Sequence, residues 1–241
     1  MAETKKFELT SDFVINALGK KLFRIKALIS FAGVKAGEMG GYVEKEKNLS
    51  QYGDAWVCGN ARVYGNARVY GNARVYDNAR VYGDAWVCGN AEVSDNARVS
   101  DNAWVYGNAR VSDNARVYDN AWVYGNARVY DNARVSDNAR VSGDAWVCGN
   151  ARVSDNADYT TIKGFGTEFR CTTFFRCKDG CVRVVCGCFY GTIDEFREQV
   201  NKTRSGKIAK EYLMIADLME LHFEKENVPN ESEEQKSMSE M

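Results

Sequence analysis

The chain has 241 residues, of which 45% are hydrophobic and 27% are charged, and its formal net charge is -1. Such a balance gives no general attraction to nucleic acid or to an anionic membrane surface. No apolar run approaches the roughly 18 residues of a membrane span, and MAETKKFELT at the start lacks the apolar core of a secretory signal. We therefore expect a cytoplasmic protein whose eight cysteines are mostly reduced, and which binds neither membranes nor nucleic acid in general.

Residues 1–53 are predicted to form an N-terminal β cap. The segment FVINALGKKLFRIKALISF contains two alternating, strand-like runs around Gly19 and Lys20, which predicts a hairpin. GGYVEKEKNLSQYG follows, with Val43 and Leu49 in phase with the alanines of the repeat that begins at residue 54. A repeat protein needs such a cap because its open end is an unpaired sheet edge.

Residues 54–155 are a tandem repeat of seventeen hexads of the form [N/D]-A-x-V-[Y/S/C]-[G/D]. Ala and Val are two residues apart, so in a strand both point to one face, and the residues between and after them point to the other. The pair G-N, D-N or G-D then predicts a turn, because Gly and Asn tolerate a positive φ. Each hexad is therefore a short strand and a corner, and only stacked coils can bury its apolar side.

Hexads with Val and a small residue at fixed offsets resemble the hexapeptide-repeat proteins, of the kind found in bacteria and their phages. The resemblance implies a left-handed parallel β-helix with three hexads per coil, although Tyr, Ser or Cys after Val departs from the family's usual small residue. The corner residues obey a period of 18, since glycine recurs at Gly71, Gly89 and Gly107 and aspartate at Asp77 and Asp95. The expected fold is mainly β, a left-handed parallel β-helix with an N-terminal β cap and a C-terminal ββαα cap.

Residues 156–223 are predicted to form that C-terminal cap. A hairpin is expected around Asp179-Gly180, and TIDE, residues 192–195, is a capping box that opens a helix with Ile193, Phe196 and Val200 on one side. A second helix is expected over about residues 207–223, from its apolar spacing. The acidic remainder, residues 224–241, is expected to be a disordered tail.

Five of the cysteines fall within a stretch of eighteen residues around this hairpin: Cys171, Cys177, Cys181, Cys186 and Cys188. Folding the hairpin at Asp179-Gly180 places Cys171 opposite Cys188, and Cys177 opposite Val182, on an apolar face. A buried free thiol packs as a small hydrophobe, and no CxxC pair is present. Core packing is the favoured interpretation, and a metal site or a disulfide is the alternative.

The resemblance also suggests an enzyme, because many hexapeptide-repeat proteins are trimeric acyltransferases that use a histidine as general base. The single histidine of this chain, His222, lies near the end of the second predicted helix and outside the repeats. Neither Ser nor Cys is a good nucleophile without an activating base. We therefore expect a non-enzymatic protein without catalytic residues, cofactor or metal, and a hexapeptide-class acyltransferase is the alternative.

We grouped the third residues of the hexads into columns, each of which contains residues that are 18 positions apart. The three columns differ in their residues. One column is arginine in every coil: Arg62, Arg80, Arg98, Arg116, Arg134 and Arg152. Tyr64 and Tyr82 accompany it, so the column predicts bidentate sites for phosphate or carboxylate with aromatic faces for stacking. The alternative is that each arginine pairs with a corner aspartate in a weak surface ion pair. Asp is missing at Gly65 and Gly83, so Arg62 and Arg80 are expected to be the least neutralised.

A second column carries tryptophan at Trp86, Trp104 and Trp122, with Tyr106 and Tyr124 beside it, and the third column is mixed. The tryptophans are interpreted in three ways: stacking that stabilises the coils, an apolar patch that mates with another subunit, or a carbohydrate platform. The favoured hypothesis is a binding or assembly module that forms a homo-oligomer, such as a trimer, through this side. Its other candidate partners are an anionic, nucleotide-like molecule, which a phage-encoded version would sequester, and a host protein.

Overall fold

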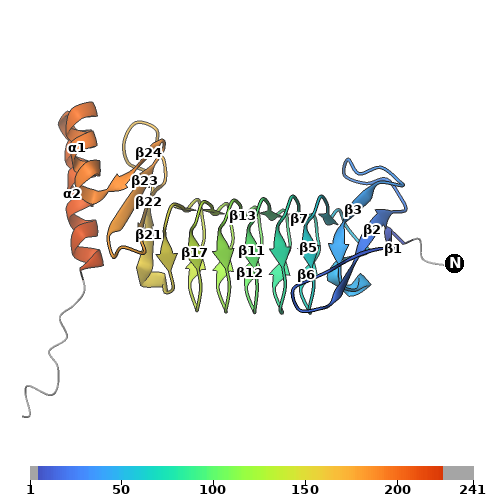
Figure 1. Cartoon of the computed structure of the whole chain (residues 1–241). Helices are drawn as coiled ribbons and strands as arrows, with labels where there is room; N and C mark the ends of the chain where they lie inside the picture. Colours follow the sequence, from blue (N-terminus) through green and yellow to red (C-terminus); the bar gives the residue numbers. More distant parts are fainter. Residues whose placement is uncertain (1–4, 225–241) are drawn as a thin grey trace, which may run out of the picture.

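The computed structural model describes residues 5–224, so the predicted tail lies, apart from Glu224, outside the described residues. Figure 1 shows an elongated molecule: a solenoid fills the middle, a small β cap lies at one end, and a sheet with two helices lies at the other. Neither helix of this part of the chain has both the length and the apolar character that crossing a membrane requires. The fold is mainly β, with about six solenoid turns.

The solenoid consists of seventeen two-residue strands, one for each hexad. They are β4 (Trp56–Val57), β5 (Arg62–Val63), β6 (Arg68–Val69), β7 (Arg74–Val75), β8 (Arg80–Val81), β9 (Trp86–Val87), β10 (Glu92–Val93), β11 (Arg98–Val99), β12 (Trp104–Val105), β13 (Arg110–Val111), β14 (Arg116–Val117), β15 (Trp122–Val123), β16 (Arg128–Val129), β17 (Arg134–Val135), β18 (Arg140–Val141), β19 (Trp146–Val147) and β20 (Arg152–Val153).

These strands form three parallel sheets. One contains β5, β8, β11, β14, β17 and β20, the second β4, β7, β10, β13, β16 and β19, and the third β6, β9, β12, β15 and β18. Equivalent residues pair in register, as Arg62 does with Arg80 and Trp86 with Trp104. Side chains in one sequence column therefore lie side by side on one face of the molecule.

The alanines and valines of the hexads form the core, as the sequence predicts. From Ala55 to Val153, each of them is at most 1% exposed. Burying apolar area is the main favourable term in folding. A uniform column of Ala and Val fits because every coil offers the same space as the one before it.

The corners are left-handed at the last position of the hexad, which is Gly or Asp. Asp101 has a φ of 58° and Gly83 one of 70°. The sequence assigned this conformation to Gly and Asn, but no Asn of residues 5–224 has a positive φ. A non-glycine residue there costs about 1–2 kcal/mol. At Asp101 the Oγ of Ser100 donates a 2.7 Å hydrogen bond to the carboxylate and so holds the side chain in place.

The N-terminal cap begins with the predicted hairpin, β1 (Phe7–Ile15) against β2 (Lys21–Ala27). β3 (Met39–Val43) and the short helix η1 (Glu46–Asn48) then lead into the solenoid, where β3 pairs in parallel with β5. Val43 pairs with Val63, and Leu49 with Val69. The predicted alignment of Val43 and Leu49 with the alanine column is thus wrong. The reason is that Val43 and Val63 are 20 residues apart, two more than the 18 that separate Val63 from Val81.

The C-terminal part is a four-stranded antiparallel sheet followed by two helices, where the sequence predicts only two strands. After η2 (Asn156–Asp158), the strands are β21 (Tyr159–Ile162), β22 (Thr172–Arg176), β23 (Val182–Cys186) and β24 (Phe189–Thr192). The helices are α1 (Ile193–Thr203) and α2 (Gly206–Phe223). The capping box is confirmed: Thr192 Oγ1 accepts from Glu195 N, and Glu195 Oε2 accepts from Thr192 N.

The predicted register of the cysteine hairpin is wrong by one residue. Thr172 pairs with Cys186, and Cys177 N donates to Cys181 O, so Cys171 does not face Cys188. The turn contains three residues, 178–180, instead of two, and Gly180 N donates back to Cys177 O. All eight cysteines are free thiols, of which Cys177 is buried and Cys181 exposed. In residues 5–224 no three potential metal ligands come together.

Candidate functional site

The six arginines of the first column form a continuous row, called here the arginine ladder. Consecutive members pair in register, from Arg62 with Arg80 to Arg134 with Arg152. Neighbouring strands are about 4.8 Å apart, so adjacent guanidiniums are near enough to repel. The pKa of Arg152 is lowered, mainly by burial and next by the charge of Arg134. The effect of Arg134 is a sign of that repulsion.

Five members of the ladder have no partner. Across residues 5–224, no hydrogen bond or ion pair joins any acceptor to Arg62, Arg80, Arg98, Arg116 or Arg134. Arg152 is different, because its Nη1 donates to the carbonyls of Asn132 and Ala151 at 3.2 and 2.7 Å. The ladder thus carries a row of guanidiniums that the described chain does not neutralise.

Arginines in the other two columns each have a partner. Three of them lie over tryptophan rings: Arg68 over Trp86, Arg140 over Trp122, and Arg128 over Trp146. Arg74 donates a hydrogen bond to Ala32 O. Arg110 forms an ion pair with Glu92 at 3.5 Å. Identical hexads therefore give arginines of two kinds, and the lack of partners is specific to one face.

The alternative expectation, that corner aspartates neutralise the ladder, does not describe the structure. The corner carboxylates bind closer groups: Asp95 Oδ2 accepts from Ser94 Oγ at 2.8 Å and from the backbone N of Asp113 at 3.4 Å. Asp113 and Asp131 accept in the same way from the backbone N of the next coil, and within residues 5–224 no corner carboxylate forms an ion pair with the ladder. Arg62 and Arg80 are consequently no less paired than Arg98, Arg116 and Arg134.

A depression marks the middle of the ladder. It has a volume of about 300 Å³ and is lined by Tyr82, Arg98, Ser100, Asp101, Arg116, Tyr118 and Arg134. Only Tyr82, Arg98, Arg116 and Arg134 of this set were predicted as ligand-binding residues. The predicted Tyr64 stacks on Tyr82, with ring centroids 5.0 Å apart and planes 3° apart. Burial and the neighbouring Tyr82 raise the pKa of Tyr64, and Arg80 opposes this shift.

The predicted interface residues also lie together, on the face formed by β9, β12 and β15. Trp86 stacks on Trp104 at 4.9 Å, Trp104 on Trp122 at 5.4 Å, and Tyr106 on Tyr124 at 5.0 Å. All five side chains are half-buried. Stacking covers their ring faces and leaves the edges accessible, so this tryptophan stack is less exposed than the sequence suggests.

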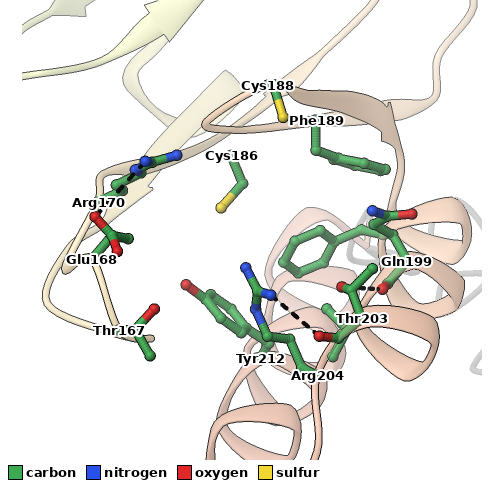
Figure 2. Close-up of a pocket in the computed structure, with 12 residues that line it drawn as sticks. Thr167, Glu168, Arg170, Cys186, Cys188, Phe189, Gln199, Thr203, Arg204 and Tyr212 are labelled. Atoms are coloured by element: carbon green, nitrogen blue, oxygen red, sulfur yellow. Dashed lines mark hydrogen bonds and ion pairs between the residues drawn. The ribbon is translucent and has the colours of Figure 1, made fainter.

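A further cavity of about 140 Å³ lies in the C-terminal part, between the sheet and the helices (Figure 2). Cys186 and Tyr212 extend toward the same space, and Arg204 borders it from the end of α1 (Figure 2). Tyr212 is held by a 3.3 Å hydrogen bond to Phe165 O, and burial raises its pKa. Sequence reasoning missed this cavity because the irregular loop before β22 forms one wall of it.

Comparison with known proteins finds a family model that matches segments of the repeat region. The family model described as the YdcK Beta solenoid repeat matches residues 55–71, 61–75, 73–89, 91–107, 109–125, 121–136, 127–143 and 133–149. The chain is a β-solenoid repeat protein. No curated protein matches it. The matched segments carry the arginine ladder from Arg62 to Arg134 and the whole tryptophan stack.

Proposed function

We propose that this β-solenoid is a non-catalytic module that binds an anionic ligand along its arginine ladder. The observation that carries the proposal is the set of five guanidiniums in register without an acceptor, on a molecule whose other repeat arginines are paired. Guanidinium binds phosphate and carboxylate through two parallel hydrogen bonds. A bound anion would also relieve the repulsion between neighbouring arginines.

We further infer that the solenoid is a left-handed helix of the hexapeptide-repeat kind, with three hexads in each coil. The inference is supported by pairing between residues 18 apart, such as Arg98 and Arg116. Three unlike faces then divide the roles: the arginine face binds the ligand, the tryptophan face makes contacts between copies, and each arginine of the mixed face contacts a carboxylate, a carbonyl or a ring of the chain itself.

Self-association is the second part of the proposal. The tryptophan stack supports it, because Trp86, Trp104 and Trp122 stack in register on three neighbouring strands of one face. Aromatic residues are enriched in the cores of protein interfaces. A homo-oligomer, such as a trimer, would place an arginine face outward on each copy. A cytoplasmic, phage-encoded module of this kind would sequester an anionic host molecule or block a host protein.

The acyltransferase alternative finds less support. His222 is exposed at the end of α2, with its ring 5.0 Å from that of Phe223, and α2 packs on the C-terminal sheet. An activated nucleophile needs a base within hydrogen-bonding reach, and no histidine lies in the repeats.

Thermal unfolding tests the ligand proposal. Inorganic tripolyphosphate should raise the unfolding temperature of the full chain more than chloride does at equal ionic strength. Arg116→Gln should reduce this shift, and Arg110→Gln, which removes one positive charge from a different face, should keep it. A shift that both variants retain in full, or no shift in the wild type, would reject the ladder as an anion site.

A further inference from the structure

The column of tyrosines beside the arginine ladder is interrupted once, by a serine that lies between two tyrosines. In successive coils the residue after Val is Tyr64, Tyr82, Ser100 and Tyr118. Where tyrosines follow each other they stack, as Tyr64 does on Tyr82 at 5.0 Å with planes 3° apart. Ser100 interrupts this stack. Tyr82 and Tyr118 are therefore two strands apart, roughly 10 Å at about 4.8 Å per strand, which leaves room for one flat ring.

The same interruption elsewhere is closed by a side chain. On the tryptophan face, Cys88 separates Tyr70 from Tyr106. There Tyr70 packs edge-on against Trp86, with ring centroids 5.7 Å apart and planes at 86°, and burial first, then the nearby Cys88 thiol, raise the pKa of Tyr70. At Ser100 no ring turns in, and the gap is part of the 300 Å³ depression. Within residues 5–224 it is the one gap of a single coil between two tyrosines that no neighbouring ring closes, since the gap between Tyr76 and Tyr130 spans two coils.

The walls of this gap have opposite charges. Arg98 and Ser100 point to the same side of β11 and are about 7 Å apart along the strand, and Asp101 lies beyond Ser100 at the corner. Ser100 is only 5% exposed and forms the floor, with its hydroxyl bound to Asp101 Oδ2. The gap therefore runs from the guanidiniums of Arg98, Arg116 and Arg134 to a single carboxylate.

We propose that this gap binds the base of a purine nucleotide, with the phosphates on the arginine ladder and the base edge facing Asp101. The proposal rests on the proposed function, because it uses the same guanidiniums for the phosphates. A flat base stacks favourably between aromatic rings. A carboxylate accepts several hydrogen bonds. Guanine offers it two adjacent N–H donors, while adenine offers an amino group beside an acceptor nitrogen. The chemistry of the gap therefore favours guanine.

Isothermal titration calorimetry of the full chain with GTP, ATP and inorganic tripolyphosphate separates the two proposals. Tripolyphosphate reports the ladder alone. GTP should bind about 10-fold tighter than tripolyphosphate, since stacking of one base contributes about 5-fold to 150-fold in affinity, and ATP should lie between them. If tripolyphosphate and both nucleotides fail to bind, the proposed function is overturned as well. If all three bind equally, the base site is overturned and the ladder stands.

Two variants test the gap itself. Ser100→Tyr should fill it with a third stacked ring, abolish the advantage of GTP over tripolyphosphate, and leave tripolyphosphate binding unchanged. Ser136→Tyr, on the other side of Tyr118, is the matched control and should keep the advantage. Asp101→Asn, which tolerates the corner's φ of 58°, should remove the preference for GTP over ATP. A Ser100→Tyr protein that keeps the full advantage of GTP would contradict the proposal.

Discussion

Arg98 and Arg116 lie opposite each other on β11 and β14, and neither guanidinium has a hydrogen-bond acceptor among residues 5–224. Like charges directly opposite each other in a sheet are destabilising by roughly 0.2–1 kcal/mol. Arg116→Gln should therefore raise the free energy of unfolding by about that amount at low ionic strength, and the gain should shrink as salt screens the charges.

Urea unfolding at two salt concentrations measures this effect. Arg110→Gln serves as the control, because it removes an arginine that pairs with Glu92 at 3.5 Å and should give no gain at low salt. If Arg116→Gln destabilises the protein as much as Arg110→Gln does, the ladder is not under the repulsion that its geometry implies.

The tryptophan stack should hold copies of the chain together. Trp104 lies in its centre, stacked on Trp86 and Trp122. Trp104→Arg places a charge there, between coils that tolerate arginine at the equivalent Arg68 and Arg140, so the fold should survive while the oligomer dissociates. Light scattering should report the 27.0 kDa monomer. An unchanged oligomer with native circular dichroism would count against this face as the interface.

The two ends of the solenoid demand opposite caps, because each strand donates its N–H groups to the following coil, as Arg62 N does to Ala79 O. The first coil presents carbonyls and needs donors, and Asn48 Nδ2 donates to Ala67 O at 2.8 Å. The last coil presents N–H groups and needs acceptors. Thr173 Oγ1 accepts from Trp146 N at 3.0 Å and is 1% exposed.

Thr173→Val keeps the shape of this side chain and removes the acceptor. The buried N–H of Trp146 is then unsatisfied, which should lower the free energy of unfolding by about 1–3 kcal/mol. Chemical denaturation measures the loss. Thr160→Val, at a half-buried position of β21, is the matched control and should cost less. Equal losses in the two variants would show that the Thr173 hydroxyl does not cap the coil.

Lys6 should make the N-terminal cap more stable at alkaline pH. Its Nζ donates to Gly53 O and Ala55 O, and burial lowers its pKa from 10.5 to about 8, an effect that nearby Asp54 partly opposes. Below pH 8 the folded and unfolded states both hold the proton, so the cost of burying the charge is fully present. Between about pH 8 and 10.5 only the unfolded state keeps the proton, so stability rises with pH.

The difference in free energy of unfolding between wild type and Lys6→Met isolates this contribution from the thiols and phenols that titrate in the same range. The difference should grow in favour of wild type from pH 8 to pH 10.5. Parallel curves over that window would mean that Lys6 keeps its ordinary pKa in the folded state.

Much of the solenoid could be predicted from its sequence because each hexad repeats one local rule. Ala97 and Val99, two residues apart, predict a strand with both side chains inside, and both are fully buried. A spacing of 18 residues groups Arg98 with Arg116, which pair. The flanks do not repeat, so their register depends on turn length. One extra turn residue moved Cys177 opposite Cys181, and two extra residues moved Val43 from the alanines to the valines.

The candidate site was harder to predict, because partners depend on side-chain placement in three dimensions. The corner residues in the sequence suggested that Arg62 and Arg80 are the least neutralised, but the Asp95 carboxylate binds Ser94 and the next coil's backbone instead of an arginine. The gap at Ser100 leaves a trace in the sequence, as one serine between two tyrosines in a column. The sequence has the same pattern at Cys88, but there Tyr70 packs into the space. Only the structure distinguishes the two positions.

The most direct test of the arginine ladder is calorimetric titration of tripolyphosphate into two triple variants. Arg98→Gln/Arg116→Gln/Arg134→Gln removes three charges from the ladder, and Arg74→Gln/Arg110→Gln/Arg128→Gln removes three from the mixed face. Saturable binding that survives the second set and disappears with the first is the result that the ladder predicts. Equal loss in both, or binding that neither set alters, would contradict it.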